Sequence, residues 1–242
     1  MPRFFSLLLL LAGIAVSAVG PAVAPAHGQE AGGVSSPALS RCAGRVGIDM
    51  RQADAAFGVV ALDGMPWLTI ERTEESVGTQ PISTTITGTG DYRRRNGTSV
   101  PFRFTCVLDA QGQALMFHAS PLIRQLGDAL PPAIVVEGTA SYRERMALPR
   151  GAELRVQILD VAKSPAEILA EQVVRSGWQV PIPFALRLPK ETSFEGRRLA
   201  LAARLVLAHQ VLFELREPLP VVGTDFLKPI ELVLDKAQVT NR

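Results

Sequence analysis

The chain has 242 residues, of which 47% are hydrophobic and 20% are charged, and its 25 basic side chains nearly balance its 23 acidic ones. Near-neutrality argues against nucleic acid as a partner, since such proteins usually carry a strong excess of Lys and Arg. Two cysteines and scattered histidines lack the spacing of metal ligands, so we predict neither a metal nor a cofactor.

Residues 1–28 have the pattern of a secretory signal peptide. One basic residue, Arg3, precedes an apolar run from Phe4 to about Val19, and small residues follow it. Gly20 and Pro21 interrupt the apolar run before it is long enough to cross a bilayer. We therefore predict cleavage after residue 28 and a mature protein that works outside the cytoplasm.

The mature chain is predicted to have no transmembrane span and no lipid anchor. No later apolar stretch approaches the length of about 18 uncharged residues that a span requires. A lipid-modified cysteine would follow a box of small residues, whereas Cys42 follows the bulky Arg41. We expect a soluble protein.

Residues 29–37 are small and polar, which predicts a flexible leader, and a helix is expected to begin near Pro37. Cys42 lies on the apolar side of this helix. In a secreted chain, we expect it to pair with Cys106, although two separate buried thiols would also fit the sequence. The chain-entropy model values such a disulfide at about 4 kcal/mol.

Residues 38–120 are predicted to form a small antiparallel β domain stapled to the helix by this disulfide. Asn96-Gly97 indicates a hairpin turn with positive φ at both residues. Downstream of it, Phe102, Phe104 and Cys106 alternate with polar residues and should share a buried face. The glycines of "GTG", residues 88–90, are interpreted as a bulge or a sharp twist.

Residues 121–132 end in two prolines and are predicted to be a linker. Beyond it, residues 133–238 contain a series of short strands with alternating apolar residues, which predicts a β-sandwich. Within this region, residues 164–177 also have a helix signature, with Ser164 as N-cap, Glu167 three residues later and Gly177 as a stop. The residues alone therefore favour a helix for 165–176.

The order of segments "VEGTASYRERMALPRGAELRVQILDVAKSPAEILAEQ", "QVPIPFALRLP", "LALAARLVLAHQVLFE" and "PVVGTDFLKPIELVLDKA" resembles the YscW/YbaY-like family of bacterial envelope proteins. Its members include pilotins, which assist outer-membrane secretins of type III secretion systems, and the YbaY lipoproteins. The resemblance implies an Ig-like or transthyretin-like antiparallel β-sandwich over residues 133–238, and hence a mainly β protein with one N-terminal helix. It also implies a strand around residues 168–174, with at most one helical turn at 165–168, and a periplasmic location.

The sequence contains no catalytic constellation that we can identify. His118 is expected near the end of a strand and His209 in a turn, and neither has an obvious base or orienting partner. We therefore predict a non-catalytic, pilotin-like protein that binds an envelope protein, for which a secretin or another assembly subunit is the candidate.

Binding is predicted at a sandwich edge, where a partner could add a strand, and the residues chosen for this contact are Trp178, Pro181 and Phe184. A second candidate contact is the basic cluster Arg93, Arg94 and Arg95 at a hairpin end, for which simple solvation is the competing interpretation. The alternative function is a cell-wall or carbohydrate ligand module, in which Trp67 and Trp178 would stack on sugars.

Overall fold

The structure is a computed structural model that describes residues 35–53, 57–123, 127, 129–176, 179–208 and 210–238. The predicted signal peptide, Trp178 and His209 lie outside the described residues. The elements are α1 (Ser35–Ala53), β1 (Phe57–Asp63), β2 (Thr69–Val77), β3 (Gln80–Arg94), β4 (Ser99–Leu108), β5 (Ala114–Pro121), β6 (Ala133–Tyr142), β7 (Glu153–Asp160), β8 (Glu167–Ser176), β9 (Ile182–Pro189), β10 (Leu199–Leu207), β11 (Gln210–Glu214), β12 (Leu219–Val221), the 3-10 helix η2 (Gly223–Leu227) and β13 (Ile230–Lys236).

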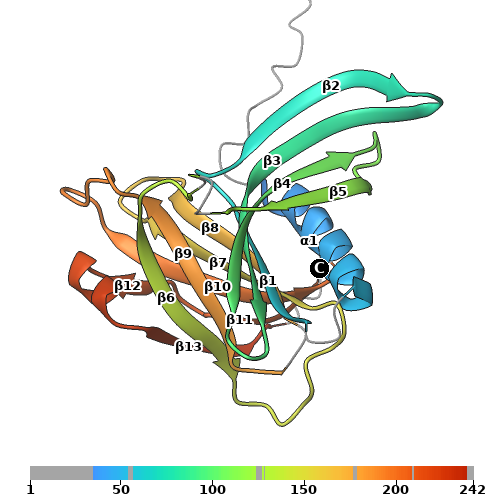
Figure 1. Cartoon of the computed structure of the whole chain (residues 1–242). Helices are drawn as coiled ribbons and strands as arrows, with labels where there is room; N and C mark the ends of the chain where they lie inside the picture. Colours follow the sequence, from blue (N-terminus) through green and yellow to red (C-terminus); the bar gives the residue numbers. More distant parts are fainter. Residues whose placement is uncertain are drawn as a thin grey trace, which may run out of the picture. The chain divides into compact units, whose positions relative to one another are not determined.

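The mainly β fold class with one N-terminal α-helix is confirmed. The strands follow the order β5-β4-β3-β1-β8-β7-β10-β11-β13-β6-β9, with β2 on β3 and β12 on β10 (Figure 1). The strands β13, β6 and β9 form the second layer of the sandwich. One detail differs from the predicted antiparallel sandwich, because β13 pairs with β6 in parallel.

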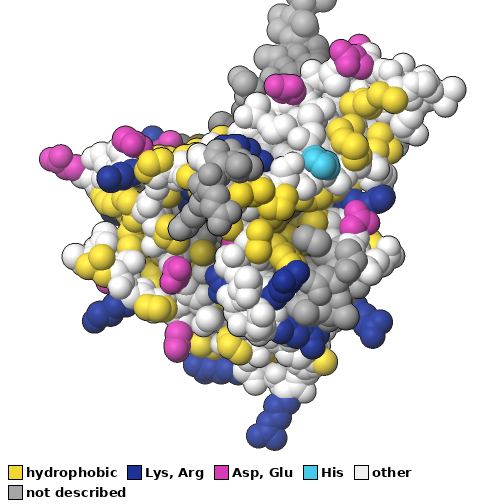
Figure 2. All heavy atoms as spheres, in the orientation of Figure 1, with side chains coloured by type: hydrophobic (Ala, Val, Ile, Leu, Met, Phe, Trp, Pro, Cys, Tyr) yellow, Lys and Arg dark blue, Asp and Glu magenta, His cyan; other side chains and the backbone are white. Residues whose placement is uncertain are grey.

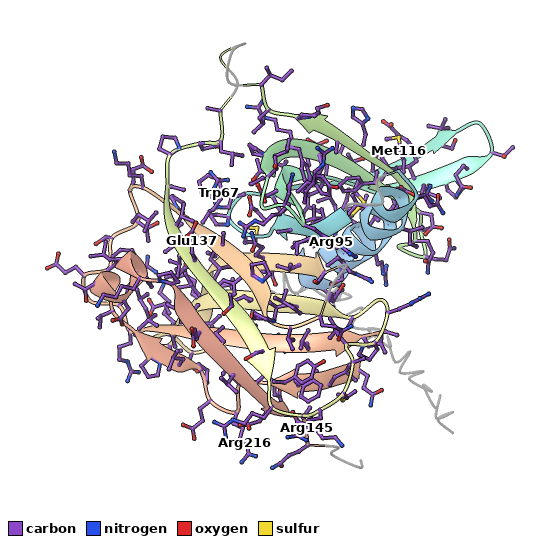
Figure 3. All side chains as sticks on the ribbon, turned by 60° about the horizontal axis from the view of Figure 1, so that its bottom comes forward. Trp67, Arg95, Met116, Glu137, Arg145 and Arg216 are labelled. Carbon is purple, nitrogen blue, oxygen red and sulfur yellow. A yellow bond between two sulfur atoms is a disulfide. The ribbon has the colours of Figure 1, made fainter. Side chains whose placement is uncertain are left out.

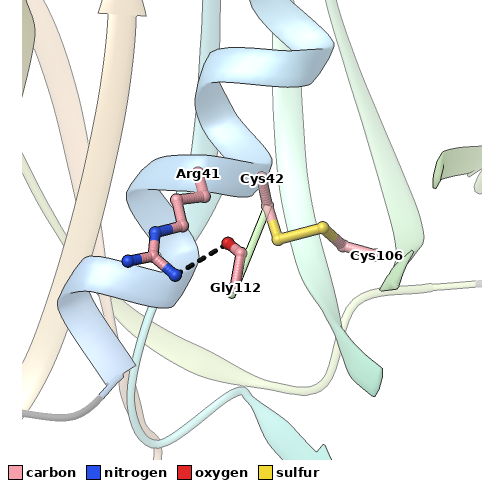
Figure 4. The surroundings of a disulfide bond; sticks show 4 residues. All are labelled: Arg41, Cys42, Cys106 and Gly112. Carbon is pink, nitrogen blue, oxygen red and sulfur yellow. Dashed lines mark hydrogen bonds between the residues drawn. A yellow bond between two sulfur atoms is a disulfide. The ribbon is translucent and has the colours of Figure 1, made fainter. Parts of the chain in front are cut away.

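The helix α1 forms because apolar residues recur every three or four positions and cover one side. It begins at Ser35, slightly before the predicted start, and its fully buried residues are Leu39, Cys42, Ala43 and Val46. Cys42 is bonded to Cys106 of β4, with the two Cα atoms 6.0 Å apart, which confirms the predicted disulfide (Figure 4). The helix is therefore tied covalently to the sheet that it covers.

Two glycines within α1, which weaken a helix intrinsically, have a packing role. A Cβ atom built on Gly44 would lie 3.0 Å from Nη2 of Arg175, and one on Gly47 would lie 3.7 Å from the aliphatic part of the same side chain. The two glycines therefore leave a shallow groove along the helix in which the Arg175 side chain lies. The helix contacts the strands β1, β5 and β8.

The glycines of β3 do not form a bulge, which corrects one of the two sequence interpretations; the other, a sharp twist, stays a prediction. The β3–β4 ladder is in continuous register from Thr84↔Leu108 to Arg93↔Ser99. A Cβ atom on Gly88 would lie 3.0 Å from the Phe104 ring, and one on Gly90 would lie 2.7 Å from the Phe102 ring. The glycines leave space for the two aromatic rings, which lie on the buried face, as predicted.

The β3–β4 turn is a hairpin, as predicted, but its geometry differs from the prediction. Gly97 has a φ of +86°, whereas Asn96 does not have positive φ. The N–H of Gly97 donates to the carbonyl of Arg94, and the N–H of Arg94 donates to the carbonyl of Thr98. This is a three-residue hairpin loop that ends in a left-handed glycine, so only one residue has to adopt positive φ.

The strands β1 and β8 join the small sheet to the sandwich. β1 pairs with β3 on one side and with β8 on the other. Val59 and Ala61 of β1 belong to the sandwich core, whereas Val60 and Leu62 belong to the core beneath α1. Each face of β1 thus covers a different hydrophobic core, which explains its nearly unbroken apolar sequence.

Residues 167–176 form the strand β8, so the strand alternative is confirmed for them. No helical turn forms at 165–168, where a bend at Pro165 precedes the start of the strand at Glu167. β8 pairs with β1 and with β7 along most of its length. These two ladders and burial on both faces outweigh the local helix signature of Ser164 and Glu167. Within the described residues, no helix is long and apolar enough to span a membrane.

Candidate functional site

Four strand edges are candidates for adding a partner strand. β9 and β5 end the strand order, and β2 and β12 each pair with one strand only. An open edge exposes main-chain donors and acceptors, and native proteins usually protect such edges with prolines, charges or covering groups. The four edges can therefore be compared by the protection that each one has.

The edge of β9, which we predicted as the contact, is already occupied. The N–H of Ala185 donates to Oε1 of Gln172 at 2.9 Å, and Nε2 of Gln172 donates to the Ala185 carbonyl at 2.9 Å. The main-chain groups of every second residue of β9 point away from β6, so those of Pro183 and Pro189 lie on the same edge as those of Ala185. The two prolines have no N–H to donate to a partner strand. The Gln172 side chain thus takes the place that a partner strand would need.

Trp67 covers a further part of this edge, since its indole Nε1–H donates to the carbonyl of Arg187 at 2.7 Å. Phe184 is only 4% exposed and packs inside the sandwich, so its side chain does not face a partner, contrary to the predicted role. Pro181 is exposed at the start of β9. Since Trp178 lies outside the described residues, a contact there stays a prediction.

The edges of β2 and β12 are protected in other ways. β2 carries Glu71, Arg72, Glu74 and Glu75 among its nine residues, and its register shifts between Arg72 and Glu75. Charges and a bulge on an edge both disfavour pairing with another strand. β12 has three residues and contains Pro220, so it offers almost no ladder.

The edge of β5 has the least protection. The strand contains no Lys, Arg, Asp or Glu, and its Met116 side chain is 48% exposed (Figure 3). The N–H of Leu122 donates to the carbonyl of Pro101 in β4, and the antiparallel alternation then directs the main-chain groups of Phe117 and Ala119 away from β4. Among the described residues, none bonds to these outward groups.

A buried polar cluster lies where the small sheet meets the sandwich. Asp63 at the end of β1 accepts hydrogen bonds from Thr89 Oγ1 at 2.7 Å and from Gln172 Nε2 at 3.1 Å. Nη1 of Arg187 lies 3.3 Å from the same carboxylate. Burial raises the pKa of Asp63 above its usual value, against the lowering effects of Thr89, Arg187 and Gln172. This cluster was not predicted from the sequence, although Asp63 at the end of an apolar strand and Arg187 within another are signals of it.

A polar groove of about 340 Å³ runs over the face of β2–β5 that is opposite α1. Thr69, Thr87, Thr105 and His118 lie side by side on successive strands in one row, and Arg103 pairs with Thr89 and with Ser120 in the next row. Trp67 closes one end, with the Arg187 guanidinium carbon 4.6 Å from its ring centroid. The groove can offer hydroxyl, imidazole and guanidinium groups to a polar ligand.

Two further sequence predictions can be placed in the structure. Arg93 and Arg94 end β3 and Arg95 begins the turn, away from Trp67 (Figure 3), so the basic cluster is at a hairpin end, as predicted. Figure 2 shows Lys and Arg side chains spread over the visible face without a single basic patch. His118 is exposed and its Nε2 lies 3.1 Å from Ser120 Oγ. Within the described residues, no group of acidic, His and Cys side chains is arranged to hold a metal.

Comparison with known proteins shows what the C-terminal part is similar to. Residues 131–234 match the model of the type III secretion system lipoprotein chaperone family, YscW. Among solved structures, the chain is similar to an alternative pilotin from the type II secretion system of Vibrio cholerae, with 26% identity over 43% of this chain and 96% of that chain and a TM-score of 0.39. No curated protein matches the chain. The predicted YscW-like character of the C-terminal part is thus confirmed.

Proposed function

We propose that this protein is a non-catalytic, pilotin-like assembly factor of the bacterial envelope, which binds another protein in the periplasm. The observation that carries the proposal is the match of residues 131–234 to the YscW family of secretion chaperones. Pilotin-like proteins act by binding, and a secretin or another subunit of an envelope machine is therefore the expected partner. His118 is exposed and its ring contacts the hydroxyl of Ser120, an arrangement that is consistent with such a role.

The contact that we propose is the edge of β5, in place of the β9 edge predicted from the sequence. An extended segment of the partner would take up the outward N–H and C=O groups of Phe117 and Ala119, and would continue the sheet beyond β5. Since this strand lacks charged residues, the added segment would meet no unpaired charge. The one proline of this edge, Pro121, ends the strand, whereas a strand added to β9, β2 or β12 would meet a bonded side chain, charges or a proline within the ladder.

The test is in-cell cross-linking of the tagged mature protein, followed by mass spectrometry of the captured proteins. Capture of a secretin or another envelope-assembly subunit is expected. Ala119→Pro removes one outward N–H without touching the β4–β5 ladder, and it should strongly reduce capture, whereas the control Ala119→Val keeps the N–H and should not. Equal capture by both folded variants would overturn the β5 contact alone; absence of any envelope protein would overturn the function.

A second candidate function is binding of a cell-wall or other carbohydrate ligand, and the polar groove over β2–β5 is the observation that favours it. An aromatic ring beside hydroxyl and guanidinium groups is a suitable surface for a sugar. Sedimentation of the mature protein with purified peptidoglycan tests this candidate. Retention that Arg103→Ala abolishes would favour it, and a protein that stays entirely in the supernatant would exclude peptidoglycan as the ligand.

A further inference from the structure

A small cavity lies between α1 and the sandwich, away from the β5 edge and the polar groove. Its volume is about 150 Å³, and α1, β7, β8 and the turn after β10 all contribute to its wall. At about 30 Å³ for each water molecule, this is room for a small ion with some of its hydration water. The cavity belongs to neither of the surfaces considered above.

The wall of this cavity is rich in positive charge. Three arginines line it, namely Arg41, Arg155 and Arg175, whereas Glu153 is the one carboxylate among its lining residues. The Arg155 and Arg175 side chains are only 12% and 18% exposed, and that of Glu153 is 5% exposed. Charges removed from water in this way favour a counter-ion, since burial of a charge is costly unless another group compensates it.

Each of the three guanidinium groups is held in a fixed position. Arg155 donates twice to Oε1 of Glu153, at 3.0 and 2.7 Å. Arg175 donates from Nη1 to the carbonyl of Gly151 at 2.6 Å, and Arg41 donates from Nη1 to the carbonyl of Gly112 at 2.7 Å (Figure 4). The groups are therefore preorganised, so that binding of an anion would need little reordering of side chains.

Ser40 of α1 is a further polar residue in the wall of this cavity. Its hydroxyl is buried behind this wall, with the residue 8% exposed, and within the described part of the chain its Oγ has no hydrogen-bond partner. A buried hydroxyl without a partner is unfavourable, and native structures usually satisfy such groups. Rotation of the Ser40 side chain would bring its hydroxyl to an acceptor oxygen in the cavity, and an oxyanion presents such oxygens to a hydroxyl and to guanidinium groups alike.

We propose that this cavity binds a small oxyanion, as a phosphate group or a carboxylate, through Ser40, Arg41 and the guanidinium groups of Arg155 and Arg175. The site is independent of the proposed function, since it involves neither the β5 edge nor any partner protein. The oxyanion joins α1 to the strands β7 and β8, and its binding therefore stabilises the contact between the helix and the sandwich. A free ion and a charged group of a larger ligand share this chemistry.

The test is isothermal titration calorimetry of the mature protein with sodium phosphate and with sodium acetate, each against sodium chloride at the same ionic strength. Saturable binding of phosphate alone assigns the site to a phosphate group, and saturable binding of acetate alone assigns it to a carboxylate. Arg41→Gln should weaken binding about tenfold or more, because a charge-assisted hydrogen bond is lost. The matched control Arg45→Gln, one turn further along α1 and paired with Asp49, should bind as the wild type does.

Ser40→Ala separates a binding role from a structural one. Removing an unsatisfied buried hydroxyl should raise the thermal midpoint in anion-free buffer, while the affinity for the anion falls about threefold to tenfold. A stabilised variant that binds the anion as tightly as the wild type would overturn the role of Ser40. Heats that do not exceed those of sodium chloride for both anions would overturn the site.

Discussion

The buried pair of Asp63 and Arg187 should be worth several kcal/mol to the folded protein, because it joins the two parts of the sheet. The side chains are 5% and 9% exposed, and their charged atoms lie 3.3 Å apart. Removing one partner of such a pair typically costs about 3–5 kcal/mol. Arg187→Met should therefore lower the free energy of unfolding by about 4 kcal/mol, since Arg187 also donates to the carbonyl of Pro131 at 2.6 Å.

Asp63→Asn should cost less, about 2 kcal/mol, because the amide oxygen still accepts the bond from Thr89 while Arg187 loses its counter-charge. The double variant should cost little more than Arg187→Met alone, since the second change removes an interaction that is already lost. Urea unfolding of the mature protein at pH 7 measures all three values. The control is Arg216→Met, whose ion pair with Asp235 is 71% and 45% exposed and should be worth less than about 1 kcal/mol.

Two results would refute this reasoning. One is an Arg187→Met variant that is no less stable than Arg216→Met, and the other is a double variant whose cost equals the sum of the single costs. The pH dependence gives a further check. Because the pKa of Asp63 is raised, the folded state takes up its proton before the unfolded state does as the pH falls. Its titration therefore increases the free energy of unfolding of the wild type toward acid pH, and since Asn cannot titrate, the cost of Asp63→Asn should grow there.

Three more changes have calculable outcomes. Replacing Cys42 and Cys106 by Ala should lower the free energy of unfolding by about 4 kcal/mol in urea, since their 64-residue separation sets the entropy that the disulfide removes; a loss below about 1 kcal/mol would contradict this. Gly138→Ala should destabilise by about 3 kcal/mol in the same assay, because its Cβ would lie 2.3 Å from a main-chain carbonyl oxygen of β13. The pKa of Asp160 is lowered, chiefly by a hydrogen bond from the main-chain N–H of Ala162. The pKa of Glu167 is also lowered, chiefly by a hydrogen bond from Lys163. The two carboxylates should stabilise the folded protein fully above the usual carboxyl pKa, and this stabilisation should be lost as the pH falls through the lowered pKa values. The thermal midpoint of the wild type should therefore change more between pH 6 and pH 3 than that of the double variant Asp160→Asn, Glu167→Gln.

The features that the sequence predicted are those with a local signal. Alternation placed Phe102, Phe104 and Cys106 on one buried face, and the apolar side of α1 together with the predicted secretion indicated the disulfide. The dipeptide Asn96-Gly97 predicted the hairpin but not its loop type, because a glycine with positive φ occurs in several loop geometries.

The features that the sequence did not predict depend on contacts between distant residues. The hydrogen bonds of Gln172 with Ala185 join β8 to β9, two strands that do not pair with each other, and no local pattern distinguishes such a glutamine from a solvated one. The same applies to Arg187, which reaches Asp63 across 124 positions of the chain. As a result, the prediction chose the β9 edge for the partner, although that edge is already occupied.

The strand β8 offers a last test of how the two parts of the chain depend on each other. Its edge is paired with β1, from Val59↔Ser176 to Asp63↔Gln172, and its Val173 belongs to the core beneath α1. A fragment of residues 131–238 would keep the family-matched strands but would leave this apolar edge unpaired. An unprotected edge of this kind is a template for aggregation.

We therefore expect the fragment 131–238 to aggregate or to unfold without a cooperative transition, whereas the mature chain unfolds cooperatively in urea and stays monodisperse in light scattering. The variant Val173→Lys places a charge on the exposed edge and should recover part of the solubility of the fragment, while the same change in the mature chain should destabilise it, because Val173 is fully buried there. A fragment that is monomeric and unfolds sharply without this change would show that the sandwich does not need β1. Val173→Lys is thus expected to help the fragment and to destabilise the mature chain, because β8 lies between the two hydrophobic cores.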